Sequence, residues 1–317
     1  MKNKIARREF LKTVGAGALA GAGLGTGAPL ARAASVGGIK NISDKKPRLL
    51  SSCCAYSYRE LLSTGKMSYE DLILKAVELG LDAVDMTVYY FKSTNPGYLD
   101  SLRNLAYRNA VAFSGAACNA TMVKTDAAAR AEVLVQIKKW VDAADRLGAS
   151  HLRIFAGDLP AGVTTQQAID WSVETMKAGC DYSAEKGITL GIEDHGNITS
   201  SANACLEIME RVNSPYAGIN LDITHFTATP AQDAYAQIAA CMPYATVSHI
   251  RDHWDDSKPG DSKPVDMERV WRLYAEAGHK GYMAVEYSPE ETGEPAITGA
   301  PKLIAKTIEL CRKYSSV

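Results

Sequence analysis

Short apolar segments alternate with segments of helical pattern along most of the chain, and this alternation restricts the fold more than any other feature. Parallel strands need a crossover connection between them, and the usual crossover is a helix. Regular alternation therefore predicts an α/β protein with a parallel sheet. Eight strand–helix pairs favour a single-domain (β/α)8 TIM barrel over an open doubly wound sheet. No G-x-G-x-x-G motif follows the first strand, which argues against a dinucleotide-binding fold.

The predicted elements are read from apolar patterning and from cap residues. The predicted strands are 48–55, 83–87, 111–116, 151–155, 188–193, 216–222, 245–249 and 282–286. The predicted helices are 68–79, 99–109, 127–147, 165–186, 201–212, 230–241, 266–277 and 299–314. Helix 68–79 is the best marked, because Ser68 and Asp71 form a capping-box-like start and Gly80 a typical stop.

The first 34 residues have the parts of a twin-arginine signal peptide. The Arg7–Arg8 pair lies in a basic start, a weakly apolar stretch covers 14–29, and 31–33 read Ala-Arg-Ala, a cleavage motif. A disordered basic tail or a membrane anchor is the alternative, but the stretch is too short and too rich in glycine to span a bilayer stably. We therefore expect export by the twin-arginine machinery to the periplasm or the medium, with no stable membrane anchor.

Removal of this segment leaves a linker at 35–47 and the barrel at 48–317. Residues 1–34 hold six basic residues and one acidic residue, so the remainder carries 29 basic against 35 acidic residues, a net charge of −6. An acidic surface argues against a nucleic-acid partner, because phosphate backbones require basic patches. The expected partners are a small carbohydrate and, as an open alternative, a second copy of the chain in a homo-oligomer.

Four ionisable residues lie at the ends of successive predicted strands. The strands read ITLGIE, YAGINLD, ATVSH and YMAVE, and they end in Glu193, Asp222, His249 and Glu286. The gaps of 29, 27 and 37 residues suit one strand plus one helix. A single carboxylate there could be a helix cap or an ion-pair partner, but four in order converge on one barrel mouth. Two glutamates, an aspartate and a histidine predict a site for one divalent cation.

Polar and aromatic residues next to these strand ends suit a polyhydroxy substrate with a carbonyl group. The candidates for substrate binding are Arg153, His195, His225, Arg251, Asp252 and Trp254. Aromatic residues just past strand ends are expected to form an apolar wall or simply to pack. They are Tyr56, Tyr58, Tyr89, Tyr90, Phe91, Trp254 and Tyr287. The polar loop 255–265 fits either a lid or a plain surface loop.

Four motifs carry a resemblance to a known family: GIEDHG (191–196), NLDITH (220–225), VSHIRD (247–252) and GYMAVEY (281–287). Over about residues 48–314 the chain resembles the xylose isomerase-like barrel superfamily, specifically the sugar phosphate isomerase/epimerase group that includes ketose 3-epimerases. The resemblance implies that Glu193, Asp222, His249 and Glu286 hold one divalent ion, commonly Mn²⁺, with Co²⁺, Mg²⁺ or Zn²⁺ as alternatives. It also implies that Glu193 and Glu286 act as the catalytic acid/base pair.

This resemblance implies a metal-dependent sugar isomerase or epimerase. The cation would stabilise an enediolate, one glutamate would remove the proton alpha to the carbonyl, and the other would return a proton. A 3-keto-glycoside lyase needs the same base and cation and is an alternative. A non-catalytic sugar- or metal-binding barrel is another.

The related endonuclease that cuts at abasic DNA sites is disfavoured. It needs histidines from early strands, but residues 48–147 contain none, and its last D-x-H motif falls on Asp261-Ser262-Lys263.

Overall fold

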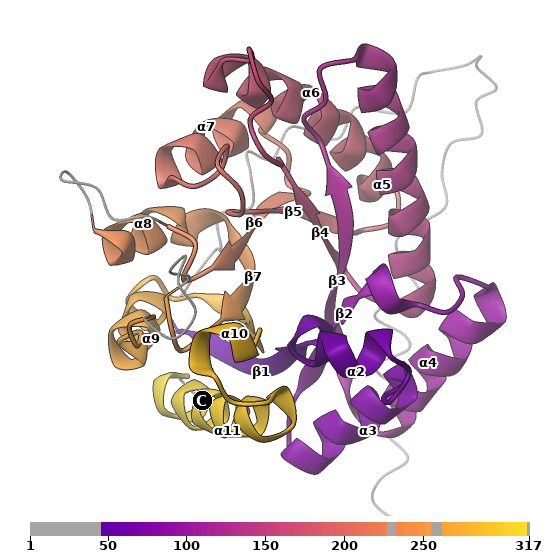
Figure 1. Ribbon diagram of the computed structural model, residues 1–317, viewed down its shortest axis with the longest axis vertical. Helices are drawn as coiled ribbons and strands as arrows, with labels where there is room; N and C mark the ends of the chain where they lie inside the picture. The colour runs from indigo at the N-terminus through magenta and orange to yellow at the C-terminus, as the bar shows by residue number, and fades with distance from the viewer. Residues whose placement is uncertain (1–45, 227–232, 255–261, 316–317) are drawn as a thin grey trace, which may run out of the picture. The chain divides into compact units, whose positions relative to one another are not determined.

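The computed structural model describes residues 46–226, 233–254 and 262–315, and these residues form a closed barrel of eight parallel strands (Figure 1). The strands follow one another in chain order, and β1 also pairs with β8. The predicted (β/α)8 barrel is therefore confirmed. The predicted signal peptide and most of the predicted linker lie outside the described residues, as does the first part of the helix predicted from residue 230.

The strands are β1 (Arg48–Cys54), β2 (Ala83–Thr87), β3 (Ala112–Thr121), β4 (His151–Phe155), β5 (Thr189–Glu193), β6 (Ala217–Asp222), β7 (Ala245–Ile250) and β8 (Lys280–Val285). The helices are α2 (Arg59–Ser63), α3 (Tyr69–Leu79), α4 (Pro96–Arg108), α5 (Ala127–Leu147), α6 (Thr165–Ala184), α7 (Ala202–Val212), α8 (Ala234–Cys241), α9 (Met267–Glu276), α10 (Pro289–Thr292) and α11 (Ala296–Tyr314). None of these described helices is both long enough and apolar enough to cross a bilayer.

Four predicted boundaries were wrong by several residues. Helix α8 begins at Ala234 instead of residue 230, because Asp233 is its N-cap and accepts a hydrogen bond from Ala236 N. Helix α4 begins at Pro96 instead of residue 99, because the Asn95 side chain accepts a hydrogen bond from Gly97 N and proline suits the first helical turn. Helix α11 begins at Ala296 instead of residue 299. Strand β3 continues to Thr121 instead of ending at residue 116. Its last residue pairs with Phe155 of β4, so β3 extends to the rim of the barrel.

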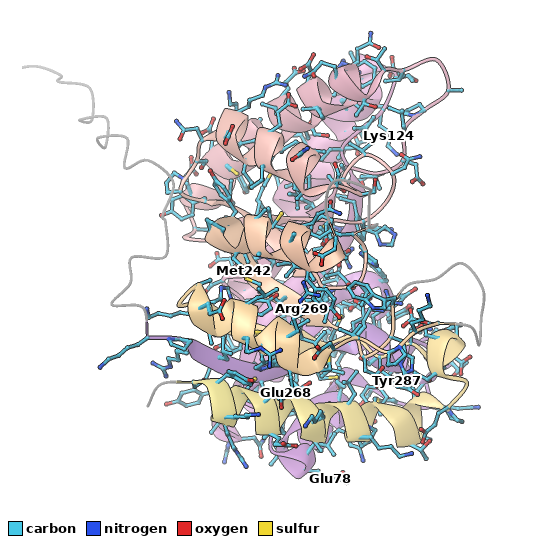
Figure 2. The ribbon with its side chains drawn as sticks, turned by 90° about the vertical axis from the view of Figure 1, so that its left-hand side faces the viewer. Glu78, Lys124, Met242, Glu268, Arg269 and Tyr287 are labelled. Atoms are coloured by element: carbon cyan, nitrogen blue, oxygen red, sulfur yellow. The ribbon has the colours of Figure 1, made fainter. Side chains whose placement is uncertain are left out.

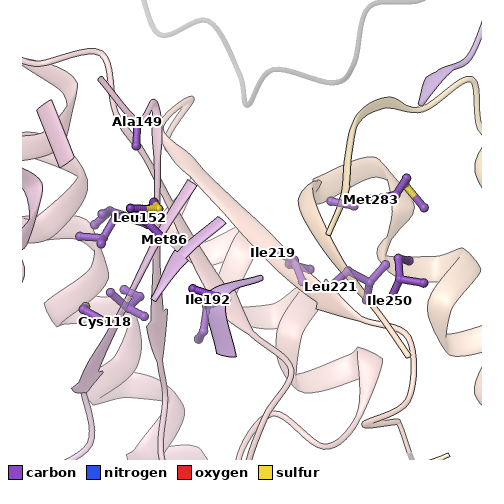
Figure 3. Packing of buried hydrophobic residues seen from close by; sticks show 14 of the residues in the cluster. Met86, Cys118, Ala149, Leu152, Ile192, Ile219, Leu221, Ile250 and Met283 are labelled. Atoms are coloured by element: carbon purple, nitrogen blue, oxygen red, sulfur yellow. The ribbon is translucent and has the colours of Figure 1, made fainter. Parts of the chain in front are cut away.

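The two faces of each strand have different chemistry because successive side chains point to opposite sides. Outward-facing residues such as Leu152, Ile192 and Leu221 belong to the buried apolar cluster between the strands and the helices (Figure 3). The inward-facing positions near the carboxyl ends of the strands are polar instead, as Arg153 and Asn220 illustrate, and both are buried. The barrel therefore collects buried polar groups at one end.

Glycine is required where a histidine fills the barrel below this polar layer. A Cβ atom on Gly191 would lie 2.2 Å from Nε2 of His151, a distance that no side chain tolerates. The same Nε2 is 3.1 Å from Oγ1 of Thr246 on β7, so the ring of His151 crosses the barrel interior. The small residue on β5 thus leaves room for a side chain from β4.

The buried ring of His279 predicts a pH-dependent contribution to stability. Burial lowers its pKa to about 4, so the unfolded chain binds more protons than the folded chain between its ordinary pKa of 6.5 and about 4. Stability contributed by the neutral ring is therefore lost as the pH falls through this window, by about 3 kcal/mol. Urea unfolding measures the free energy of unfolding of wild type and His279→Leu at pH 7 and at pH 4. Between pH 7 and pH 4 the variant should become more stable relative to wild type by that amount. An equal difference at both pH values would contradict the assignment.

Candidate metal centre

The four predicted strand-end residues are brought together at the carboxyl end of the barrel. Nδ1 of His249 lies 2.8 Å from Oε1 of Glu193 and 3.0 Å from Oε2 of Glu286. Ligand atoms of Glu193, Asp222 and His249 all lie within 4.8 Å of one another, and these three residues are buried. Glu286 follows the last residue of β8 and keeps 12% of its side chain exposed, so it faces the opening.

The electrostatics of the cluster favour a positive charge between the carboxylates. Burial by itself lowers the pKa of His249, but Glu286 and other neighbours raise it well above its ordinary value. Burial raises the pKa of Glu193, yet the Arg153 guanidinium and the His249 ring lower it to about 2. The pKa of Glu286 is likewise held well below its usual range, chiefly by His249 acting against burial. The carboxylates therefore stay ionised around one nitrogen.

A carboxylate on β2 orients the histidine. Nε2 of His249 donates a hydrogen bond to Oδ2 of Asp85 across 3.1 Å, and Asp85 is fully buried. With Nε2 used in this way, Nδ1 faces the two glutamates. Histidines that bind metals commonly donate their other ring N–H to such a carboxylate, which fixes the tautomer.

Asp222 resembles His249 in that one of its side-chain atoms is held by a hydrogen bond while the other is directed toward the metal centre. Its Oδ1 accepts hydrogen bonds from the backbone nitrogen and the hydroxyl of Thr224, at 2.8 and 2.6 Å. Its Oδ2 is buried and, among the described residues, has no hydrogen-bond partner, although Nε2 of His225 and Nη1 of Arg251 lie 3.6 and 3.7 Å away. A buried carboxylate oxygen of this kind needs a partner, and a cation provides one. The donor set of carboxylates plus one oriented imidazole fits a divalent metal ion.

Two residues of this centre were missed by the sequence analysis. Asp85 carries a related but weaker signal, since it is an acidic residue in an apolar strand but lies in the middle of that strand and not at its end. Cys54, the last residue of β1, has its Sγ atom 3.4 Å from Oε2 of Glu286. Ligand atoms of Cys54, His249 and Glu286 also lie within 4.8 Å of one another. A cysteine at a strand end gives no comparable signal, because free cysteine is commonly a small buried apolar residue.

Four of the six predicted substrate-binding residues adjoin the centre. Nη1 of Arg153 lies 3.2 Å from Oε2 of Glu193. Nε2 of His225 lies 3.6 Å from Oδ2 of Asp222 and 3.1 Å from Nη1 of Arg251. The rings of His195 and His225 are edge to face, with centroids 4.7 Å apart. Arg251 is in turn paired with the buried carboxylate of Glu291 on α10.

The other two predicted substrate-binding residues are not brought to the centre. Within the described residues, Asp252 is paired with His253 at 2.9 Å, and the ring of Trp254 packs against Tyr235 with centroids 5.3 Å apart. The chain turns away after β7, because His253 forms an antiparallel bridge with Pro264. Their role in substrate binding stays a prediction. Most of the loop 255–265, the predicted lid, lies outside the described residues.

The predicted aromatic wall is divided between the rim and the core. Tyr58 and Tyr287 are buried packing residues, with 1% and 2% of their surface exposed. Tyr56 and Tyr89 meet edge to face, with centroids 6.5 Å apart. The guanidinium of Arg153 lies 5.8 Å from the ring centre of Tyr89, which connects this aromatic pair to the metal centre.

Removing the charge of Asp85 tests whether it orients the histidine. Asp85→Asn should weaken metal binding about 10- to 100-fold, because a group that holds a metal-binding histidine in place contributes that much. Calorimetric titration of the metal-free protein with Mn²⁺ measures the change. Asp82→Asn is the matched control, since Asp82 hydrogen-bonds Ser51 at the amino-terminal approach to the same strand. Equal Mn²⁺ affinities in Asp85→Asn and Asp82→Asn would show that Asp85 does not orient His249 for metal binding.

The fold and the centre together define a (β/α)8 barrel with a buried carboxylate–histidine site at its mouth. The chain belongs to the xylose isomerase-like TIM barrel family, whose model matches residues 73–314.

Individual proteins give more distant matches. A putative hydroxypyruvate isomerase from Danio rerio is 22% identical over 171 residues, which cover 50% of this chain and 60% of that protein. The IOLI protein, solved with a binding zinc atom, is 18% identical, with a TM-score of 0.66 over 84% of this chain and 100% of that one. D-psicose 3-epimerase from Clostridium cellulolyticum H10, solved with D-tagatose, is 13% identical, with a TM-score of 0.67 over 84% of this chain and 99% of that one.

Proposed function

We propose that this protein is a metal-dependent sugar isomerase or epimerase that removes the proton alpha to the carbonyl of a keto sugar. The observation that carries the proposal is that two glutamate carboxylates approach one oriented histidine nitrogen, Glu193 at 2.8 Å and Glu286 at 3.0 Å. Glu193 ends β5 and Glu286 directly follows β8, so they reach a ligand at the mouth from different sides. The relatives support this reaction class, because they include an epimerase solved with a keto sugar and a putative isomerase.

Glu193, Asp222, His249 and Glu286 would hold the cation. The bound cation supplies the positive charge that stabilises the sugar oxygens as the neighbouring C–H bond is deprotonated. Mn²⁺ is the metal we favour, with Co²⁺, Mg²⁺ and Zn²⁺ as the alternatives. The zinc atom in the IOLI structure supports a divalent metal in this fold.

The two glutamates share the proton transfers. Glu193 is oriented by Arg153 at 3.2 Å and by Nδ2 of Asn220, which donates to Oε1 at 3.2 Å. Arg153 and His249 keep it ionised at neutral pH, which is the form that can receive a proton from the sugar carbon. Glu286 is the more exposed partner, so it can take up a proton from solvent and then deliver it to the same carbon from the opposite face, or to the neighbouring carbon. Return to the same carbon gives an epimer, and transfer to the neighbour gives an isomer.

The basic residues beside Asp222 would position the sugar. Arg251 is fixed by its ion pair with Glu291, and it contacts the ring of His225. Both side chains present polar N–H groups of the kind that bind sugar hydroxyls and a carbonyl oxygen. With the twin-arginine signal predicted at residues 1–34, we place this activity in the periplasm or outside the cell.

Proton NMR in D₂O tests the proposal on the metal-loaded protein with a panel of free ketoses and 3-keto-glucosides. Deuterium should appear at the carbon alpha to the carbonyl, and the products then distinguish an epimerase, an isomerase and a 3-keto-glycoside lyase. Absence of exchange and of product across the panel, in protein that holds one metal ion per chain, would contradict the proposal and favour a binding role.

A further inference from the structure

A second pocket opens at the rim of the barrel, where β3 and β4 end. Its volume is about 370 Å³, within the usual range for small-molecule sites, and its lining includes Thr121, Lys124, Gly157 and Asp158. Figure 2 shows Lys124 at the same end of the barrel as Tyr287, the residue that follows Glu286. The pocket therefore opens on the side of the metal centre.

The strand register gives the separation between this pocket and the metal centre. Thr121 pairs with Phe155, and Phe155 pairs with Glu193. Two strand spacings put the backbone of Thr121 about 10 Å from that of Glu193. The Phe155 ring lies between the two regions, with the guanidinium of Arg153 3.9 Å from its centre and the ring of His195 5.1 Å away. The two regions are therefore separated by about two strand spacings, which is close enough for one extended ligand to reach both.

The cationic side of the pocket is held in place. Nζ of Lys124 donates a hydrogen bond to Oγ1 of Thr121 at 2.8 Å. The carbonyl oxygen of Lys124 accepts a hydrogen bond from Nη1 of Arg130 at 2.8 Å, which fixes the backbone beneath the side chain. An ammonium group has three N–H donors, so the bond to Thr121 leaves donors for a ligand.

The side of the pocket formed by Gly157 and Asp158 is hydrogen-bonded to the segment that follows Glu193. Oδ1 of Asn197 accepts a hydrogen bond from Leu159 N at 2.6 Å, and Asn197 N donates to Oδ1 of Asp158 at 3.4 Å. Gly196 has a φ of +78°, and a Cβ there would lie 3.0 Å from the carbonyl oxygen of Gly157, so the close approach of the two loops favours glycine. The pocket wall and the metal centre therefore share one stretch of chain.

The lining chemistry indicates the class of ligand. One ammonium, one carboxylate and the hydroxyls of Thr121 and Thr125 surround the pocket. The two charges balance, which disfavours a phosphate or a carboxylate ligand, whereas the mixture of donors and acceptors suits sugar hydroxyls. Val123 and Pro160 add apolar surface for the C–H face of a ring.

We infer that this pocket is a second sugar subsite, and that the substrate is a keto sugar carrying a glycosyl unit that binds between Lys124 and Asp158. The inference rests on the proposed function for the identity of the reacting sugar. The glycosyl unit in the pocket does not react. Its contacts there increase the affinity of the protein for a glycoside over that for a free ketose.

Binding of keto disaccharides tests the subsite independently of turnover. The probes are lactulose and isomaltulose, each a fructose unit with a glycosyl extension, compared with fructose by calorimetric titration of the metal-loaded protein. At least one disaccharide should bind about tenfold more tightly than fructose, the gain expected from one charge-assisted hydrogen bond. In Lys124→Ala and in Asp158→Asn the ratio should fall to about one. Lys75→Ala is the matched control, because Lys75 pairs with Glu78 on α3, and it should keep the wild-type ratio.

Each outcome decides the inference. Equal affinities for fructose and both disaccharides, no binding of any probe, or an advantage that persists in both pocket variants would overturn the subsite. A disaccharide advantage that is lost in the variants, with no deuterium exchange from any sugar, would support the subsite and contradict the proposed reaction. The two claims therefore fail separately.

Discussion

Glu286→Gln should slow proton exchange alpha to the carbonyl by orders of magnitude, while the barrel stays folded. Glutamine is nearly isosteric with glutamate but can neither accept nor deliver a proton, so the expected loss in rate is about 10²- to 10⁴-fold. Glu193→Gln should have a similar effect, because Glu193 lies on the other side of the same nitrogen, 2.8 Å from His249 Nδ1. Deuterium incorporation followed by NMR at saturating metal gives both rates.

Two controls separate chemistry from folding and metal loss. Glu78→Gln changes an exposed glutamate on α3 that pairs with Lys75, and it should leave the rate at the wild-type value. Metal content is measured in each variant, so that a lower rate is compared at equal occupancy. Wild-type exchange in either active-site variant would show that the glutamates are ligands without a role in proton transfer.

Metal binding should produce the second large effect, a gain in stability. A ligand that binds only the folded chain stabilises it by about 4 kcal/mol when present at 1,000 times its dissociation constant. The gain arises because the cation adds a positive charge among buried carboxylates that otherwise share one imidazole. Among the described residues, Asp222 Oδ2 has no hydrogen-bond partner there and only the longer ion-pair contacts to His225 and Arg251. Urea unfolding of chelator-treated protein, with and without added Mn²⁺, measures the difference.

A single oxygen should account for much of this response. Asp222→Asn replaces the facing carboxylate oxygen and removes its charge, so most of the Mn²⁺-dependent stabilisation should disappear. Asp170→Asn is a matched control, since Asp170 pairs with Arg211 on the surface. If Mn²⁺ stabilises Asp222→Asn as strongly as wild type, then the cation binds elsewhere.

The sequence predicted the barrel and the grouping of the four strand-end residues because both follow from local patterns. An ionisable residue that ends an apolar strand is visible in the sequence, and a closed parallel barrel places such ends at one mouth. Asp85 and His249 illustrate the limit. Their contact joins β2 to β7 across the barrel interior, and only the closed barrel shows that these two side chains meet.

The second pocket depends on a boundary that the sequence did not reveal. Strand β3 was predicted to end at residue 116, and the small residues that follow it show little apolar alternation. The structure extends the strand to Thr121, since its neighbour β4 pairs with it up to Phe155. That extension places Lys124 at the rim. Cap residues were more informative, and Ser68 begins its helix with the predicted capping box.

Anomalous diffraction from crystals of the Mn²⁺-loaded protein, recorded at the manganese edge, tests the central claim most directly. The account predicts one strong peak per chain, surrounded by Glu193, Asp222, His249 Nδ1 and Glu286, with Asp85 on the far side of the histidine ring. A protein that takes up Mn²⁺ but shows no peak among these four side chains, or shows its strongest peak elsewhere, would contradict it.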